Sequence, residues 1–533
     1  MTSFSEVATP VAEKHLTHPK YRTDINGLRA IAVVAVVLYH FGIPGFSGGF
    51  VGVDVFFVIS GFLMTGIIIS GLERGSFSLW DFYLARARRI VPALLVLCAS
   101  LLLLGWFSLP SLDYKALATH VATALAFVSN IQFWKEAGYF DVASHEKWLL
   151  HTWSLSVEWQ FYILLPLGSL LVWRILGPRA LSWALMALGV GSLLLSLYAS
   201  QRWPTPAFYL LPTRIWEMLS GGLVWWLTRQ NRLNTKLSTL MEGVGLLLIG
   251  LAILLYDTGL AWPGHAALVP VVGAMLVLAA NRQKSWVTNN FIARHLGASS
   301  YSIYLWHWPL VVILNYLGES NNPILIVSCI ALSIIMGELS YRLIENPSRV
   351  KLSRLNKYKE PATTFIPTSL IIVSACFIYI SNGVNTNWRP GASTEASKYI
   401  DKYSKENYLT EFVKNEYREE CNFFDAEQFV AKKASIASSC TQWKDGKSVF
   451  LWGDSHAQAL SYGLRQNFKT DVILHQVASS ACQPHLGGDT ATQGEFKIAC
   501  DRSNDFAINE IHRAVAEAEC NTVIDLKLEH DAA

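Results

Sequence analysis

The stretch DINGLRAIAVVAVVLYH, residues 24–40, decides the fold of this chain. It is a run of Ala, Val, Ile and Leu with Arg29 near its beginning and His40 at its end. A segment this apolar is expected to enter a bilayer, where ionisable side chains are costly and need a reason. Eleven residues separate Arg29 from His40, so on a helix both point from one face, about 16 Å apart along the axis. They are either a snorkelling Arg with an interfacial His or a functional pair within the membrane.

The composition agrees with a membrane protein. The chain has 533 residues, of which 52% are hydrophobic and 16% are charged, whereas about 25% of the residues of a soluble domain are charged. The net charge of +3 is too small to argue for a nucleic-acid partner. No small-residue cleavage site follows the first apolar run, so we expect a retained first helix and not a signal peptide.

Apolar stretches long enough to span a bilayer recur along the chain. They cover residues 27–43, 50–70, 90–109, 155–173, 181–200, 207–228, 238–256, 265–281, 298–316, 323–343 and 364–381. These are eleven predicted spans. A twelfth stretch, 116–134, is weaker because it contains Ser129, Asn130 and Gln132.

Charge placement predicts the topology. Lys and Arg gather after every even-numbered span, while connections such as 257–264 and 317–322 contain neither. By the positive-inside rule this places the N-terminus in the cytoplasm and the tail on the other side, provided that 116–134 is a re-entrant or surface helix. Five of eight cysteines lie in the polar last quarter, which is typical of an oxidising compartment. We therefore expect a multi-pass bacterial inner-membrane protein with a periplasmic C-terminal domain.

Several polar residues lie in or beside the predicted spans. Arg86 and Arg89 belong to a cluster of three arginines that is either a topogenic signal or a phosphate-binding site. His151 and Glu158 lie at the mouth of the fourth span, and His307 lies within the ninth among residues that could simply form an aromatic belt. Two smaller motifs have plain structural explanations. Arg214 and Glu217 could pair, three residues apart on a helix, and Glu345 could cap the end of a span.

Together these motifs resemble those of the membrane acyltransferase-three family, which includes O-antigen and peptidoglycan O-acetyltransferases. The matching segments are Arg29–x10–His40, GGFVGVDVFFVISGFL (48–63), FYLARARRIVPAL (82–94), HTWSLSVEWQFYILLPL (151–167), YSIYLWHWPL (301–310) and IENP (344–347). The resemblance covers about residues 20–350.

The resemblance implies acyl transfer from a cytoplasmic acyl-CoA, usually acetyl-CoA, to a hydroxyl of a surface or lipid-linked saccharide such as O-antigen or lipopolysaccharide. It implies that the Arg29–His40 pair and an Arg-x-x-Arg loop, Arg86 and Arg89, are essential. His40 would act as general base or transient acyl carrier, with Arg86 and Arg89 on the nucleotide phosphates of the donor. Glu158 is a further catalytic candidate, and His151 and His307 would support the site. The acyl-CoA is a donor substrate, and we expect no permanently bound cofactor or metal.

The tail reads as a soluble α/β fold. Strands are predicted at 448–452, 471–477 and 521–526, and helices at 457–468 and 506–518, an alternation that favours a parallel, doubly wound sheet. Ser455 follows the first strand and precedes a helix, where backbone N–H groups and the helix dipole favour an oxyanion. This block resembles that of SGNH hydrolases, which implies that Ser455 is the nucleophile.

The expected partner of Ser455 is missing from the sequence. SGNH hydrolases use a late Asp-x-x-His as the base, and Glu529-His530-Asp531 lacks that spacing. We expect a shortened or altered domain in which Ser455 is a poor nucleophile. Cys421 is expected to pair with Cys440 and Cys482 with Cys500, which leaves Cys520 alone.

The predicted organisation is a polytopic helical bundle followed by an extracytoplasmic α/β domain. Its parts are a cytoplasmic tail (1–23), a membrane acyltransferase domain (24–350), a linker with the eleventh span (351–381), a periplasmic linker (382–420) and an SGNH-like domain (421–533). Two other functions remain open. A transporter or flippase would also line its path with buried Arg and His, and an esterase could be tethered by the spans, although eleven spans make a large anchor.

Overall fold

The chain forms two compact units, Met1–Lys398 and Tyr399–Ala533, in a computed structural model. The structure describes residues 22–137, 144–230, 233–355, 359–386, 389–404, 417–425, 430–432, 434–442, 447–468, 472–486, 494–516 and 523–525. Each unit is described by itself.

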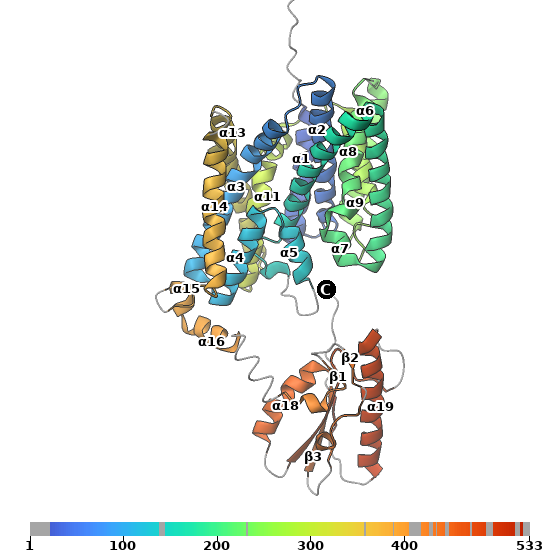
Figure 1. Cartoon of the computed structure of the whole chain (residues 1–533), viewed down its shortest axis with the longest axis vertical. Coiled ribbons are helices and arrows are strands. Elements are labelled where there is room, and N and C mark those ends of the chain that lie inside the picture. The colour runs from blue at the N-terminus through green and yellow to red at the C-terminus, as the bar shows by residue number, and fades with distance from the viewer. Residues whose placement is uncertain are drawn as a thin grey trace, which may run out of the picture. The chain divides into compact units, whose positions relative to one another are not determined.

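The first unit is a bundle of helices (Figure 1). Its main helices are α1 (Thr23–His40), α2 (Gly52–Glu73), α3 (Leu79–Ser108), α4 (Ser111–Leu125), α5 (Ser129–Glu136), α6 (Thr152–Arg202), α7 (Pro204–Tyr209), α8 (Ile215–Thr228), α9 (Thr235–Leu255), α10 (Leu268–Ala280), α11 (Phe291–Tyr316), α12 (Pro323–Ser340), α13 (Asn346–Leu352) and α14 (Lys359–Ile380). After α14 come α15 (Pro390–Ser393) and α16 (Glu395–Ser404).

Every predicted span falls on helical structure. The fourth and fifth predicted spans are the two halves of α6, which breaks at Gly177, where φ is 82°. Within the described residues, seven helices are by themselves long and apolar enough to cross a membrane, and α10 is a shorter apolar helix. A multi-pass membrane unit follows, while the number eleven stays a prediction. Stretch 116–134 forms the two short helices α4 and α5 with a break between them.

One helix begins earlier than expected. The third span was predicted from residue 90, with Arg86 and Arg89 in a loop before it, but α3 already begins at Leu79. The hydroxyl of Ser78 accepts a hydrogen bond from the backbone N–H of Asp81 and caps this end. The two arginines therefore project from a helix, three residues apart on one face.

Close helix contacts set the geometry of the bundle. Helix α1 packs along α11, and α2 packs along α8. A Cβ at Gly297 of α11 would lie 1.9 Å from the backbone oxygen of Asn26 in α1, so only glycine permits this approach. Small residues at a helix crossing let backbones meet in this way within membranes.

A buried ionic group joins α2 to α8. Arg214 precedes α8, and its Nη1 lies 2.9 Å from Asp54 Oδ1 and 2.9 Å from Glu217 Oε1. All three residues are at most 1% exposed. The predicted Arg214–Glu217 pair is thus present, and Asp54 adds a second carboxylate.

The second unit is built on a parallel sheet of order β4-β3-β5. Its strands are β3 (Lys447–Gly453), β4 (Val472–Ala478) and β5 (Val523–Asp525), and β1 (Phe424–Asp425) pairs with β2 (Val430–Ala431) in a separate ribbon. The helices are α18 (Ser455–Asn467) and α19 (Gly494–Ala516). Helix α19 begins twelve residues before the predicted start, because polar residues 494–505 that resemble a loop continue its helical turn.

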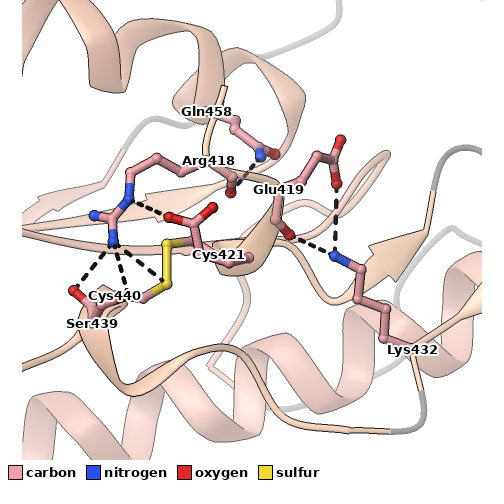
Figure 2. The surroundings of a disulfide bond; sticks show 8 residues. Arg418, Glu419, Cys421, Lys432, Ser439, Cys440 and Gln458 are labelled. Atoms are coloured by element: carbon pink, nitrogen blue, oxygen red, sulfur yellow. Dashed lines mark hydrogen bonds and ion pairs between the residues drawn. A yellow bond between two sulfur atoms is a disulfide. The ribbon is translucent and has the colours of Figure 1, made fainter. Parts of the chain in front are cut away.

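Two disulfides link segments of this unit, Cys421–Cys440 and Cys482–Cys500, as the sequence predicts. Beside the first, Arg418 donates to Glu420 and to the backbone oxygen of Ser439, and Gln458 of α18 donates to the backbone oxygen of Arg418 (Figure 2). The disulfide is thereby tied to the helix that follows β3. Cys520 lies outside the described residues.

Candidate active site

A cavity of about 90 Å³ lies among the helices of the first unit. Its lining includes four residues singled out from the sequence, namely Arg29 of α1, Arg86 and Arg89 of α3, and Glu158 of α6. The remaining lining comes mainly from α2, from the start of α6 and from α11. These four residues, which are far apart in the sequence, thus line one cavity.

The charge of the cavity is positive. Its lining holds three guanidinium groups and one carboxylate, which gives a formal net charge of +2. Arg88 does not join them, because its Nη1 lies 3.4 Å from Glu360 of α14. The Arg fork is suited to planar and bidentate recognition of phosphate or carboxylate. The cavity can therefore hold an anionic ligand.

Glu158 is held by two hydroxyl groups. Ser60 of α2 and Tyr162, one turn along α6, both donate short hydrogen bonds to Glu158 Oε1. The hydroxyl oxygens of Tyr162 and Ser60 also lie 3.1 Å apart. A carboxylate fixed in this way adds a negative charge of defined position beside the three arginines.

A histidine cluster lies further along α1. His40 is the last residue of α1, and its Nδ1 lies 3.0 Å from Nε2 of His307 in α11. The ring of His151, which precedes α6, is 5.7 Å from that of His307. His307 and His151 are 0% and 2% exposed, whereas His40 is only partly buried. His40 is thus the least buried residue of the three.

Tyr304 connects the cluster to the cavity. It lines the cavity together with Ser154, and its hydroxyl lies 2.8 Å from both Ser154 Oγ and the backbone oxygen of His151. Its ring centroid is 5.4 Å from those of His151 and His307. The arginine-lined cavity and the histidines are therefore neighbouring parts of one site.

Sequence reasoning did not single out Ser60, Tyr162 or Tyr304 as site residues. Tyr162 could have been found by its position four residues after Glu158 on one helix face.

Glu345 was interpreted as a cap, but it lies in a π-helical turn, Tyr341–Glu345, and accepts a hydrogen bond of 2.8 Å from Ser302 of α11. Single-turn π-helices are frequent at functional sites.

Ser455 is the first residue of α18, directly after β3. Asp454 caps the helix by accepting from the backbone N–H of His456 at 2.8 Å, and the exposed His456 ring faces the same carboxylate. In the described part of the chain, no hydrogen bond joins Ser455 Oγ to a histidine. The segment with Glu529, His530 and Asp531 lies outside the described residues.

Comparisons with known proteins agree on the class. The acyltransferase-three family model, described as an acyltransferase domain, matches residues 22–339, and a model described as an SGNH domain fused to such domains matches residues 420–524. No solved structure matches the chain.

Three relatives illustrate the similarity. "Putative peptidoglycan O-acetyltransferase YrhL" of Bacillus subtilis is 29% identical over 87% of this chain and 81% of its own length. "Peptidoglycan O-acetyltransferase OatA" of Listeria monocytogenes is 31% identical over 64% of this chain and 57% of its own length. "Putative membrane-bound transacylase BcsY" of Komagataeibacter xylinus is 34% identical over 67% of this chain and 89% of its own length. The chain belongs to the membrane acyltransferase-three family and carries a C-terminal SGNH domain.

Proposed function

We propose that this protein moves an acetyl group from cytoplasmic acetyl-CoA to a hydroxyl group of a saccharide on the other side of the membrane. The observation that carries the proposal is the cavity in which Arg29, Arg86 and Arg89 meet, next to the histidine cluster that contains His40. An anion site and a nearby imidazole are the two parts that transfer from a phosphate-bearing thioester requires.

The donor would bind through its phosphates. Arg86 and Arg89 project side by side from α3, near the end of the bundle where α1 begins, and they would hold the nucleotide phosphates of the acyl-CoA. The narrow pantetheine arm would then extend past Glu158 and Tyr304 toward His40. In this arrangement, the arginines bind the nucleotide end of the donor, and the thioester end reacts.

His40 would perform the chemistry. As a general base it would take the proton of the attacking hydroxyl and pass it to the sulfur that leaves. As an acyl carrier its ring nitrogen would attack the thioester carbonyl, release the thiol and then yield the acyl group to the hydroxyl. Arg29 lies about 16 Å from His40 along the same helix, and it would join Arg86 and Arg89 in holding the anionic part of the donor.

The acceptor class is supported by relatives. Two of the three relatives described above are named as peptidoglycan O-acetyltransferases, one of them as a putative one, which favours a peptidoglycan-type glycan over O-antigen or lipopolysaccharide. We also propose that Ser455, at the N-terminus of α18, occupies the nucleophile position of the SGNH domain. Because no hydrogen bond in the described part of the chain joins it to a histidine base, we expect it to be a poor nucleophile. The distribution of Lys and Arg supports the proposed orientation in the inner membrane.

Mass spectrometry of glycans tests the proposal. Peptidoglycan and surface polysaccharide should be isolated from cells that contain the protein, that lack it, and that contain the His40→Ala variant at the same level. We expect a loss of O-acetyl groups from one of these glycans in both altered strains. Unchanged acetylation in both would contradict an acyltransferase and favour a transporter.

A further inference from the structure

The hydrogen bonds around His307 determine which nitrogen of His40 reacts. His307 Nδ1 lies 2.6 Å from the backbone oxygen of Tyr304, one turn earlier in α11. A carbonyl oxygen can only accept, so the proton of this hydrogen bond belongs to His307 Nδ1. Because the ring is fully buried, the neutral form is favoured, and in that form Nε2 carries a lone pair and no proton.

The lone pair of His307 Nε2 faces His40. The two atoms His307 Nε2 and His40 Nδ1 are 3.0 Å apart, which is the distance of a normal hydrogen bond. Since His307 Nε2 accepts, His40 Nδ1 must donate. A neutral His40 then keeps its own lone pair on Nε2. Among the described residues, His40 Nε2 makes no hydrogen bond that would occupy this lone pair.

We propose that His307 is a positioning residue, which holds His40 in the Nδ1–H tautomer and leaves His40 Nε2 as the reacting atom. The series of hydrogen bonds runs from the Tyr304 carbonyl through the His307 ring to Nδ1 of His40. Trp308 supports it, because its ring meets that of His40 edge to face at 4.8 Å and its Nε1 donates to the backbone oxygen of Lys147. The tautomer of His40 follows from the hydrogen bonds alone, whereas the catalytic role of its Nε2 rests on the proposed function.

The arrangement also assists the proton transfer. When His40 Nε2 takes the proton of the saccharide hydroxyl, the hydroxyl oxygen forms its bond to the thioester carbon and the carbon–sulfur bond breaks. His40 is then an imidazolium whose Nδ1–H remains bonded to His307 Nε2, so part of the positive charge is stabilised there. The Nε2 proton passes to the departing sulfur, and both histidines return to their starting forms. An orienting partner of a catalytic histidine is typically worth about 10²- to 10⁴-fold in rate, as the Asp of the serine-protease triad illustrates.

Two variants separate this role from simple packing. Gln at position 307 keeps an acceptor oxygen that can reach His40 Nδ1, whereas Phe fills the volume of the ring without an acceptor. In His307→Phe we expect kcat to fall about 100-fold or more, with the KM for acetyl-CoA within about twofold because the arginines are untouched. In His307→Gln we expect most of the loss to be restored. Acetyl-CoA and N,N′,N″-triacetylchitotriose serve as donor and acceptor probes. Equal activity of the two variants, at any level, would overturn the proposal.

A spectroscopic measurement stands independently of catalysis. Full-length protein with ¹⁵N-labelled histidine rings, reconstituted in lipid, should show a signal that His40→Gln removes and that reports a protonated Nδ1 and an unprotonated Nε2. Protonation of His40 at Nε2 would overturn the inference even in an active enzyme. The expected tautomer in a protein that transfers no acetyl group would instead preserve the inference and refute the proposed function.

Discussion

Arg29 and His40 lie on one face of α1. Arg29 lines the cavity that Ser300 and Tyr301 of α11 also line, and His40, at the end of α1, lies within hydrogen-bond distance of His307 in α11. A rise of 1.5 Å per residue places them about 16 Å apart along the axis. One rigid helix therefore holds the anion site and the imidazole at a fixed separation, with a bound thioester able to lie between them.

The arginines of α3 should govern donor affinity. Arg86→Ala and Arg89→Ala each remove one guanidinium from the cavity. A hydrogen bond to a charged group contributes about 1.5 to 3 kcal/mol, so we expect the KM for acetyl-CoA to rise about tenfold or more in each variant. Arg88→Ala is the matched control, because Arg88 faces Glu360 outside the cavity. Steady-state kinetics in membranes provide the comparison, and an equal rise in the KM of the Arg88 variant would contradict the assignment.

The buried ionic group of α2 and α8 should respond unequally to two substitutions. Arg214→Gln leaves Asp54 and Glu217 buried without a cation, so we expect a loss of about 3 to 5 kcal/mol in stability. Glu217→Gln leaves one carboxylate with one guanidinium, and we expect a change of about 1 kcal/mol or less. Thermal unfolding in lipid nanodiscs measures both. If Glu217→Gln were the more damaging change, the charge balance described above would be wrong.

The contact between α1 and α11 should depend on Gly297. Alanine there would bring a Cβ to 1.9 Å from the backbone oxygen of Asn26, so the two helices would separate and the His40–His307 bond would lengthen. We expect Gly297→Ala to lower stability by about 1 to 3 kcal/mol and to reduce transfer. Gly191→Ala in α6 is the control, since its Cβ would meet no atom within 4 Å. Wild-type transfer by the Gly297 variant would contradict this packing requirement.

The SGNH domain should lose stability in mild acid through His475 in β4. Burial, with a contribution from the nearby Arg513, lowers the pKa of His475 to about 4. The unfolded chain binds this proton below its ordinary pKa of about 6.5, whereas the folded chain does not. Stability is therefore complete above about pH 6.5 and decreases toward pH 4, by about 3 kcal/mol in total.

Pulse proteolysis of the full chain in urea measures this dependence. His475→Gln should remove most of the decrease between pH 6.5 and 4, and His485→Gln, which changes an exposed ring, should retain it. A pH dependence that persists unchanged in the His475 variant would assign the effect to other groups.

The sequence predicted the helices of the membrane unit well, because long apolar runs have few alternatives to a helix in lipid. It also predicted that Arg29 and His40 share a face, since that follows from helical periodicity alone. The prediction that Arg86 and Arg89 lie in a loop was wrong. Arginines near a predicted membrane boundary resemble a loop, but α3 is capped at Ser78 and already includes them.

The partners across helices could not be predicted. That Ser60 of α2 donates to Glu158 of α6, or that Asp54 joins Arg214, depends on which helices are neighbours, and apolar periodicity does not encode this. The histidine cluster shows the same limit. His40, His151 and His307 were each singled out, but only the packing of α1 against α11 shows that His40 and His307 share a hydrogen bond.

Transfer across sealed membrane vesicles tests the central claim most directly. Inverted vesicles that contain wild-type protein and enclose N,N′,N″-triacetylchitotriose should acquire ¹⁴C-acetylated saccharide in their lumen when ¹⁴C-acetyl-CoA is added outside, and right-side-out vesicles should not. His40→Ala should abolish the labelled product while leaving the amount of protein unchanged. Labelled saccharide at the wild-type rate with His40→Ala, or from right-side-out vesicles, would contradict transfer through His40 from the cytoplasmic face.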